Sequence, residues 1–361
     1  MRCTRPILHG DLMIESVRIE NFRAFGSAEV SGLGRINLLV GDNRAGKTSF
    51  LEALFLTSGN NIENHLKELH WRGVFDDQIP VSSTDVKSGA LWSDLFHRFD
   101  QGRGIKIIMT GHPRRALFVD YREPDEVSVL PVGRSNATAA SSVEAPIVFT
   151  WEDATGKTYS IRPRLDEQKG LVAGKASPGI GGAMIPDAPI NAKEAADRFS
   201  KLDIAGGATP VVEAIRAEFR EITELSTQPI GPSGSMIYAR VKDVRNKIPL
   251  PMISAGINRW VFILSTIVYF RDGAVFVDEL EKGVHHERLG GFWRSIVNCS
   301  EKSNTQVFAA THSLECLNAV VPSIESDPAA FRLLRFRVGG KIEVVDGKHV
   351  IAAIKEGFEV R

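Results

Sequence analysis

Three short apolar runs stand out along this chain, and a segment of helical spacing follows two of them directly. The runs are residues 36–40, 274–277 and 305–310, in which the only polar side chains are those of Asn37, Thr305 and Gln306. Continuous apolar runs of this length are typical of strands that are buried on both faces of a sheet. Residues 49–56 come after the first run and residues from about 287 to 300 come after the second, and both segments have helical spacing. Residues from 253 onward, before the second run, have helical spacing too. Strands that alternate with helices predict an α/β fold with a parallel core sheet.

A second pattern alternates polar and apolar residues, as half-buried strands do. It begins at residues 13–20, and residues 27–30 are expected to pair back onto that strand. Further strands are predicted at residues 104–110, 116–121, 147–151 and 157–161, which indicates a small antiparallel sheet set into the fold. Residues 236–241 predict one more strand.

The remaining segments predict helices and loops. Helical spacing is seen at residues 62–69, 92–99, 193–200 and 210–224, whereas residues 136–142 and 170–189 are rich in Gly, Ala, Ser and Pro and predict loops. At 361 residues, of which 43% are hydrophobic, the chain can bury a large core. We expect a single domain over 13–361, with one lobe at about 13–165, a helical insertion at about 166–250 and a second lobe at about 251–361. Residues 1–12 predict a disordered leader whose deletion leaves folding and activity intact.

Charge and cysteine content narrow the class of protein only slightly. The formal net charge is zero, so no strong overall field marks nucleic acid or a membrane as partner. Three cysteines give no disulfide framework and fit a reducing compartment. No apolar run reaches the roughly 18–20 residues that span a bilayer. We therefore expect a cytoplasmic protein without a membrane partner.

A complete phosphate-binding loop lies between the first apolar run and its helix. Gly41-Asp42-Asn43-Arg44-Ala45-Gly46-Lys47-Thr48 matches G-x-x-x-x-G-K-[ST] in the strand–turn–helix context that the motif requires. Backbone N–H groups of such a loop and the following helix N-terminus hold phosphates. Contacts to ATP are expected from Gly41, Asn43, Ala45, Gly46, Lys47, Thr48 and Ser49. A chance glycine-rich turn is the alternative, and the flanking strand and helix argue against it.

Lys47 and Thr48 have separate expected roles within this loop. Lys47 would bridge the β- and γ-phosphates, whereas the hydroxyl of Thr48 would bind Mg²⁺.

Two carboxylates follow the second apolar run directly. Asp278 and Glu279 stand at the carboxyl end of a predicted buried strand, where ligands bind in open α/β sheets. This is a Walker B pattern, in which Asp278 would hold Mg²⁺ and Glu279 would orient and polarise the attacking water. The alternative is a pair of acids at a helix start, where the macrodipole favours them.

Two further candidates have more ordinary alternatives. His312 follows the third apolar run, so it could reach a γ-phosphate or the attacking water, although a lone histidine at a strand end often only packs or caps. Ser254 and Gly256 open the helix that starts near residue 253. They could bind the γ-phosphate held by a second subunit, or Ser254 could be an ordinary N-cap.

In this order, the P-loop, S-x-G helix, Asp-Glu strand and His strand resemble the ABC-type ATPases. Residues 14–25, 41–52 and 350–361 resemble the OLD/RecF/SMC branch of that family, and residues 278–285 closely resemble the D-E-[IL]-E-x-G-[LV]-H form of its OLD-like group. The segment at Ser254 lacks the second glycine and the glutamine of L-S-G-G-Q. Gln78 and Gln101 are both candidates for the Q-loop glutamine of the family.

The resemblance implies a Mg²⁺-dependent ATPase that forms a head-to-tail homodimer or a higher oligomer on binding ATP. It also implies control of a separate effector, such as a nuclease or toxin, as in the ATPase subunits of the anti-phage systems PARIS and Septu. A RecF-like repair ATPase that binds DNA is the alternative, with Arg114, Arg115, Arg332, Arg335 and Arg337 as phosphate contacts. A transporter ATPase is disfavoured by the long insertion between Thr48 and Ser254.

Overall fold

The centre of the molecule is a sheet to which both ends of the chain contribute. The computed structural model describes residues 13–59, 90–122, 142–166, 170–172, 179–231, 234–358 and 360. The central sheet has the order β11-β15-β16-β3-β17-β18. Its strands are β11 (Gly182–Ile185), β15 (Ala274–Val277), β16 (Gln306–Ala310), β3 (Ile36–Gly41), β17 (Phe331–Arg337) and β18 (Lys341–Asp346). The first five are parallel to their neighbours, and only β18 is antiparallel.

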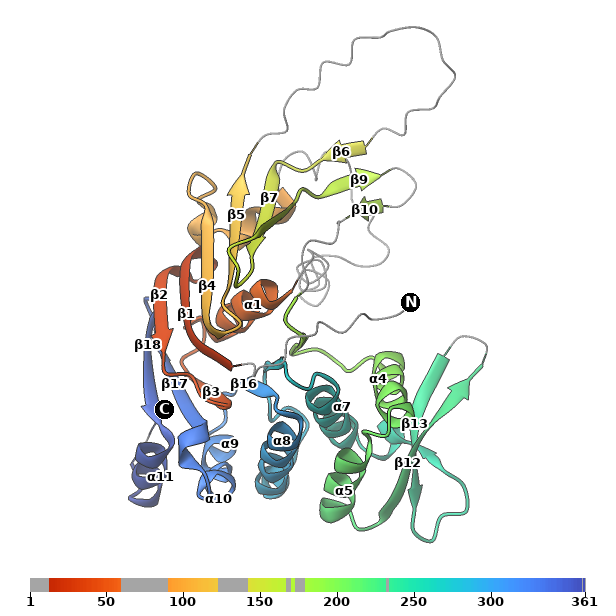
Figure 1. Cartoon of the computed structure of the whole chain (residues 1–361). Helices are drawn as coiled ribbons and strands as arrows, with labels where there is room; N and C mark the ends of the chain where they lie inside the picture. Colours follow the sequence, from red (N-terminus) through yellow and green to blue (C-terminus); the bar gives the residue numbers. More distant parts are fainter. Residues whose placement is uncertain are drawn as a thin grey trace, which may run out of the picture.

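A second, antiparallel sheet lies above the first in the view of Figure 1. It has the order β2-β1-β4-β5-β7-β8. Its strands are β1 (Met13–Phe22), β2 (Phe25–Ser31), β4 (Ile105–His112), β5 (Arg115–Tyr121), β7 (Ile147–Glu152) and β8 (Thr158–Ile161). The predicted antiparallel strands are thus confirmed, and the first strand pair proves to belong to the same sheet.

Helix α1 (Lys47–Ser58) fills the space between the two sheets. Phe50, Leu51 and Leu54 of α1 are fully buried together with residues from β1, β4, β7 and the upper face of the parallel strands. The side chain of Gln306 also joins the sheets, because it bonds to both the N–H and the C=O of Ile14 at 2.8 and 2.9 Å. A helix that is buried nearly all round holds the P-loop at its own N-terminus.

Helices cover the other face of the parallel sheet (Figure 1). They are α7 (Ala255–Tyr269), α8 (Leu289–Ser303), α9 (Leu314–Ala319), α10 (Val321–Ile324) and α11 (Gly347–Lys355). Trp260 of α7 packs on Phe292 of α8, with 4.8 Å between ring centroids. The predicted helices from 253 and 287 onward correspond to α7 and α8.

The segment from about 166 to 250 was expected to be helical, but it is mixed. Helices α4 (Ala192–Ile204) and α5 (Thr209–Glu218) are followed by β12 (Ile222–Ile230), β13 (Gly234–Val241) and β14 (Ile248–Pro249), which form a three-stranded antiparallel sheet. The helix predicted at residues 210–224 therefore ends early. Ile222 pairs with Val241 rather than continuing the helix, because the alternation from Ile222 to Thr227 suits a strand once β13 lies beside it.

Shorter elements connect these layers. They are the 3₁₀ turns η1 (Ala90–Leu95), η2 (His97–Phe99), η3 (His286–Arg288) and η4 (Pro328–Ala330), the strands β6 (Ser142–Glu144), β9 (Arg164–Asp166) and β10 (Gly170–Val172), and helix α6 (Leu250–Ile253). The helix predicted at 92–99 is thus a pair of 3₁₀ turns, and the loop predicted at 170–189 contains β10 and β11.

Several predictions lie outside the described residues, namely those on the leader at 1–12, the helix at 62–69 and most of the loop at 136–142. Among the residues that the structure does describe, no helix is both long and apolar enough to cross a bilayer.

Candidate nucleotide-binding and catalytic site

The P-loop leaves β3 at Gly41 and enters α1 at Lys47, and its two glycines are required by space and by backbone conformation. Gly41 has φ +132° and Gly46 has φ +100°, values that side chains disfavour. A β-carbon at Gly41 would collide with the carbonyl oxygen of Phe336, and one at Gly46 would lie 2.8 Å from the ring of Phe25. The loop is therefore pressed between β17 and the β1–β2 turn.

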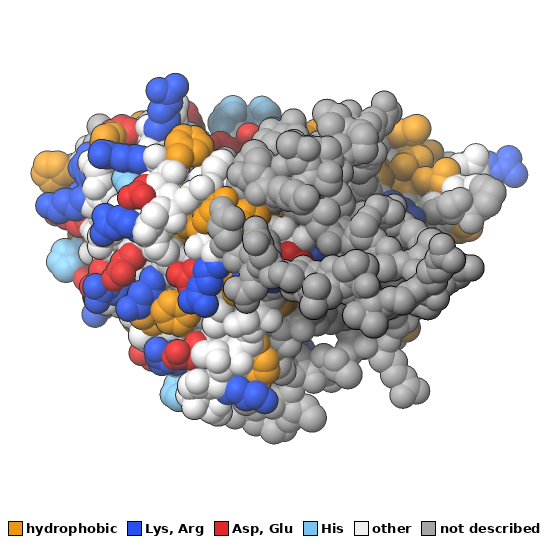
Figure 2. Space-filling view, turned by 90° about the horizontal axis from the view of Figure 1, so that it is seen from above, with side chains coloured by type: hydrophobic (Ala, Val, Ile, Leu, Met, Phe, Trp, Pro, Cys, Tyr) orange, Lys and Arg blue, Asp and Glu red, His pale blue; other side chains and the backbone are white. Residues whose placement is uncertain are grey.

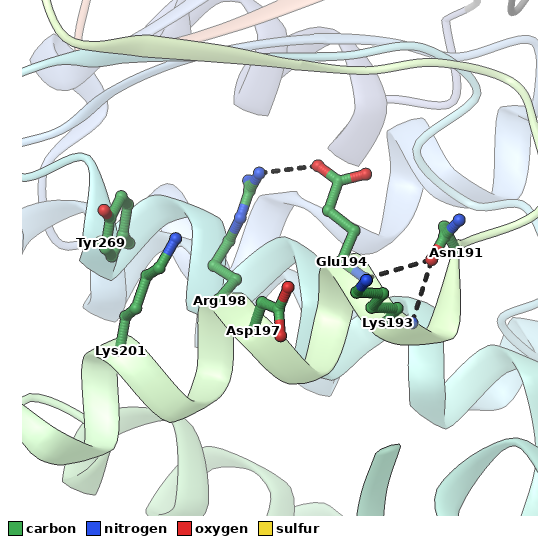
Figure 3. A pocket seen from close by; sticks show the side chains of 7 residues that line it. All are labelled: Asn191, Lys193, Glu194, Asp197, Arg198, Lys201 and Tyr269. Atoms are coloured by element: carbon green, nitrogen blue, oxygen red, sulfur yellow. Dashed lines mark hydrogen bonds and ion pairs between the residues drawn. The ribbon is translucent and has the colours of Figure 1, made fainter. Parts of the chain in front are cut away.

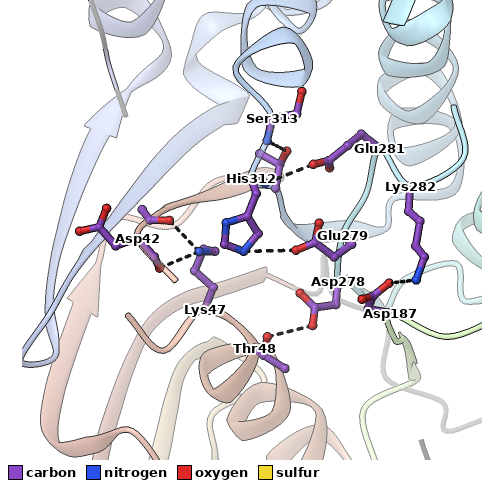
Figure 4. Close-up of polar contacts among 12 residues, drawn as sticks. Asp42, Lys47, Thr48, Asp187, Asp278, Glu279, Glu281, Lys282, His312 and Ser313 are labelled. Carbon is purple, nitrogen blue, oxygen red and sulfur yellow. Dashed lines mark hydrogen bonds and ion pairs between the residues drawn. The ribbon is translucent and has the colours of Figure 1, made fainter. Parts of the chain in front are cut away.

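Lys47 lies over this loop and is only 5% exposed. Its Nζ donates to the carbonyl oxygens of Gly41 and Asp42 at 2.7 and 3.0 Å. These bonds hold the ammonium group at the mouth of the loop (Figure 4). Thr48 and Ser49 are half-buried beside it, whereas Asn43 is exposed.

Thr48 joins the P-loop to the end of β15. Its hydroxyl donates to Oδ2 of Asp278 at 2.9 Å, and Asp278 is only 8% exposed. Burial raises the pKa of Asp278, while the Thr48 bond acts in the opposite direction. The two residues that the sequence assigns to Mg²⁺ are therefore brought into direct contact (Figure 4).

Glu279 and His312 meet across the ends of β15 and β16. The carboxylate of Glu279 lies 3.2 Å from Nε2 of His312, and both side chains are about one-third exposed or less. Burial and the neighbouring carboxylates of Glu281, Asp278 and Asp187 raise the pKa of Glu279 to about 7, although the positive charge of Lys47 acts to lower it. A carboxylate with this pKa at the open edge of a sheet has the properties of a general base.

Two acidic residues at this edge were not predicted. Asp187 follows β11, which is parallel to β15, so it leaves the sheet beside Asp278 and forms an ion pair with Lys282. Glu281 accepts a hydrogen bond from the backbone N–H of His312 at 3.2 Å. The Asp187 position depends on the pairing of strands almost a hundred residues apart, for which the sequence carries no local signal. Of the two predicted Q-loop candidates, Gln101 lies in the turn after η2 and Gln78 lies outside the described residues.

Ser254 and Gly256 lie at the start of α7, and the contacts that the structure gives them are within the chain. The hydroxyl of Ser254 caps α7 by accepting from the N–H of Ile257 at 3.3 Å. A β-carbon at Gly256 would collide with the carbonyl oxygen of Gly283, so the helix start packs directly on the loop after Glu279. The N-cap alternative for Ser254 is thus confirmed, and a contact to a nucleotide of a second subunit stays a prediction.

The arginines considered for DNA binding are largely engaged with the protein itself. Arg115 is 3% exposed and donates to the carbonyl oxygen of Thr57, and Arg335 donates to Val360 and to Glu343. Arg114 forms an ion pair with Glu152. Lys and Arg side chains alternate with Asp and Glu over the described surface in Figure 2. These observations do not favour the RecF-like DNA-binding function.

A pocket of about 330 Å³ lies elsewhere, along α4 and the end of α7 (Figure 3). Its lining is polar: Asn191, Lys193, Glu194, Asp197, Arg198, Lys201 and Tyr269. Asn191 caps α4, and Arg198 donates to Glu194 and to Thr266. The pocket includes none of the P-loop or Walker B residues.

Comparison with known proteins assigns ATPase domains to both halves of the chain. Residues 13–121 match the family described as "AAA ATPase domain", and residues 180–318 match "AAA domain, putative AbiEii toxin, Type IV TA system". An ATP/GTP phosphatase of Helicobacter pylori is 22% identical over 329 residues, which is 84% of this chain and 86% of that protein.

Two further similarities were found. The DNA double-strand break repair Rad50 ATPase of Methanopyrus kandleri is 54% identical over 111 residues, 27% of this chain and 13% of that protein. A Pyrococcus furiosus Smc head domain, solved with the C-terminal domain of ScpA, covers 95% of this chain and 98% of its own at 10% identity and a TM-score of 0.44. The two matched AAA domains and the P-loop between β3 of the parallel sheet and α1 therefore indicate an ATPase with an α/β P-loop fold, similar in part of its sequence to Rad50 and RecF proteins.

Proposed function

We propose that this chain is a Mg²⁺-dependent ATP hydrolase whose catalytic base is Glu279. The observation that carries the proposal is the meeting of the P-loop, Asp278, Glu279 and His312 at one edge of the parallel sheet (Figure 4). Phosphoryl transfer requires mainly positioning and charge stabilisation, and this edge offers a fixed cation, a buried carboxylate and a base with a raised pKa.

The loop suits a triphosphate in shape and charge. Gly41 and Gly46 leave room where side chains would block the backbone, and Lys47 supplies a positive charge held at the mouth of the loop. The adjoining N-terminus of α1 adds its partial positive charge. Lys47 would neutralise phosphate charge, while the loop amides orient the phosphate chain.

The pair Thr48 and Asp278 suits Mg²⁺, which prefers hard oxygen ligands and usually takes others from phosphates and water. In the described part of the chain, no group of three or more His, Cys, Asp or Glu side chains could hold a metal ion by itself. Phosphate oxygens would therefore complete the ligand set. When bound, Mg²⁺ would stabilise negative charge on the phosphates.

Glu279 would accept the proton of the attacking water and orient it. His312 would hold the carboxylate in position, because its Nε2 already lies 3.2 Å from Glu279.

The finer part of the proposal concerns assembly and role. A single P-loop encloses the phosphates on one side, so we propose that Ser254 of a second subunit closes the other in a head-to-tail homodimer. We also propose that the ATPase controls a separate effector, a nuclease or toxin in anti-phage defence. The match of residues 180–318 to the family described as "AAA domain, putative AbiEii toxin, Type IV TA system" supports a connection with a toxin.

The enzymatic part is tested with Glu279→Gln and Lys47→Ala. We expect Glu279→Gln to bind ATP as tightly as the unchanged protein and to turn over at least about 100-fold more slowly, the scale of one lost general base. Lys47→Ala should lose nucleotide binding, because it removes the fixed positive charge. Turnover is measured as phosphate release and binding with a fluorescent ATP analogue, each with Mg²⁺ and with EDTA.

The matched control is Glu301→Gln on the exposed surface of α8, which should leave both measurements unchanged. Full turnover in Glu279→Gln would exclude Glu279 as the catalytic base. Full turnover in EDTA would exclude a role for a metal ion in hydrolysis.

A further inference from the structure

A buried arginine binds the backbone next to the proposed catalytic base. Arg259 lies in the second turn of α7 and is only 5% exposed. Its Nη2 donates to the carbonyl oxygens of Asp278 and Glu279 at 2.8 and 3.0 Å, and its Nη1 donates to Pro186 at 3.4 Å. One guanidinium therefore connects α7 to the ends of both β15 and β11.

The backbone at this point needs such support. Glu279 has φ 47°, a conformation that costs a residue other than glycine about 1 kcal/mol or more. The chain has also just left the hydrogen-bond ladder of the sheet, whose last paired residue in β15 is Val277. Arg259 supplies donors to the two carbonyl groups that follow. The planar guanidinium presents several donors in a fixed fork, which suits adjacent acceptors.

A second contact ties the same helix to the same loop. Gly256, one turn before Arg259, packs on the carbonyl of Gly283. Between these two contacts the loop is held by three backbone bonds, from Leu280 to Ala310, from Lys282 to Glu279 and from Val284 to Glu281. The start of α7 and the Walker B loop therefore form one packed unit.

Stability alone does not explain a charged residue here. Taking a guanidinium out of water costs free energy, and apolar residues of similar volume often serve stability as well or better. Arg259 also faces four carboxylates, those of Asp187, Asp278, Glu279 and Glu281. Its hydrogen bonds go to backbone carbonyl groups, so Arg259 acts on the backbone conformation of the residues that it contacts.

We propose that Arg259 is a positioning residue: it fixes the backbone at residues 278–279 so that the carboxylate of Glu279 meets His312. The inference deepens the proposed function and rests on Glu279 acting as the base. It predicts that loss of Arg259 lowers kcat while nucleotide binding, which depends on the P-loop, is preserved.

The test compares Arg259→Met and Arg259→Lys with a matched control, Arg198→Met. The side chain of Arg198 is 14% exposed, packs on the same helix at Phe262 and Thr266, and touches the polar pocket of Figure 3 rather than the catalytic edge. Arg259→Met should lower kcat at least about 10-fold, with KM and the affinity for a fluorescent ATP analogue changed less than about threefold. Arg259→Lys should recover part of kcat, and Arg198→Met should keep the kcat of the unchanged protein.

A double mutant separates positioning from an independent effect. In the Glu279→Gln background, Arg259→Met should cause little further loss, because its effect passes through Glu279. A full, additive loss in that background would overturn the inference, and so would an unchanged kcat in Arg259→Met alone.

Hydrogen exchange tests the anchor without any turnover. In nucleotide-free protein, amides of a peptide covering 278–284 should exchange at least about 10-fold faster in Arg259→Met than in Arg198→Met. Peptides from β4 and β5 should be unchanged, which shows that the protein is folded. Unchanged exchange at 278–284 would overturn the inference, whether or not the protein hydrolyses ATP. Absence of ATP hydrolysis by the unchanged protein would instead count against the proposed function.

Discussion

At the scale of single residues, Gly256 matches the S-x-G motif, but packing of α7 against a neighbouring loop is enough to require a glycine there. The sequence assigns it to a nucleotide contact, yet in the fold its missing β-carbon lets α7 approach the carbonyl of Gly283. This contact joins the start of α7, which carries Ser254, to the loop that follows Glu279. A methyl group here would force the helix and the loop apart.

We expect Gly256→Ala to destabilise the protein by about 1–3 kcal/mol, the range for overpacking a tight contact, and to lower kcat. The control is Gly290→Ala in α8, where an added β-carbon meets no atom within 4 Å. That change should be neutral or stabilising by about 0.5–1 kcal/mol, because alanine favours helices. Denaturant unfolding and phosphate release measure both effects, and equal stabilities of the two variants would contradict the packing role.

Residues of the site were predictable from sequence where the motif is local. Gly41 to Thr48, and Asp278 with Glu279 after an apolar run, each carry their own context within a few residues. Asp187 and Arg259 do not, because their roles depend on β11 pairing with β15 and on α7 lying under both strands.

At the scale of elements, the boundary between α5 and β12 shows the same limit. Val211, Ile215 and Ile222 fit one helical face, but only Val211 and Ile215 lie in α5. From Ile222 the alternation fits a strand equally well, and pairing with β13 decides between the two. The buried parallel strands were easier to predict, since β3, β15 and β16 are apolar apart from Asn37 and Gln306.

The N-terminus of α7 allows the two roles of Ser254 to be separated. Ser254→Asp retains a good N-cap and should keep the melting temperature, whereas Ser254→Ala should lose about 1 kcal/mol and melt roughly 1–3 °C lower. If the hydroxyl also binds a γ-phosphate, Ser254→Asp should turn over at least about 10-fold more slowly through charge repulsion. Differential scanning calorimetry and ATPase assays measure the two effects, and undiminished turnover in Ser254→Asp would leave Ser254 as a cap only.

At the scale of the whole molecule, a two-fold pair would form two composite sites at once, because each subunit offers one P-loop and one Ser254 surface. Ser254→Arg should bind ATP without hydrolysing it, and Lys47→Ala should do neither. An equal mixture of these two variants should regain about a quarter of normal turnover, since half of the dimers carry one intact site. Phosphate release from the mixture is the measurement. A fully active Ser254→Arg protein would contradict the shared site.

The position of β3 between β16 and β17 also has a consequence for synthesis on the ribosome. Asn37 of β3 bonds to the carbonyl of Val307, 270 residues later in the chain. At about 5–20 residues per second, β3 would wait roughly 15–50 s for its neighbours to be translated. Its apolar surface would be without its sheet partners during that time, so we expect the nascent chain to depend on chaperones until its last third has emerged.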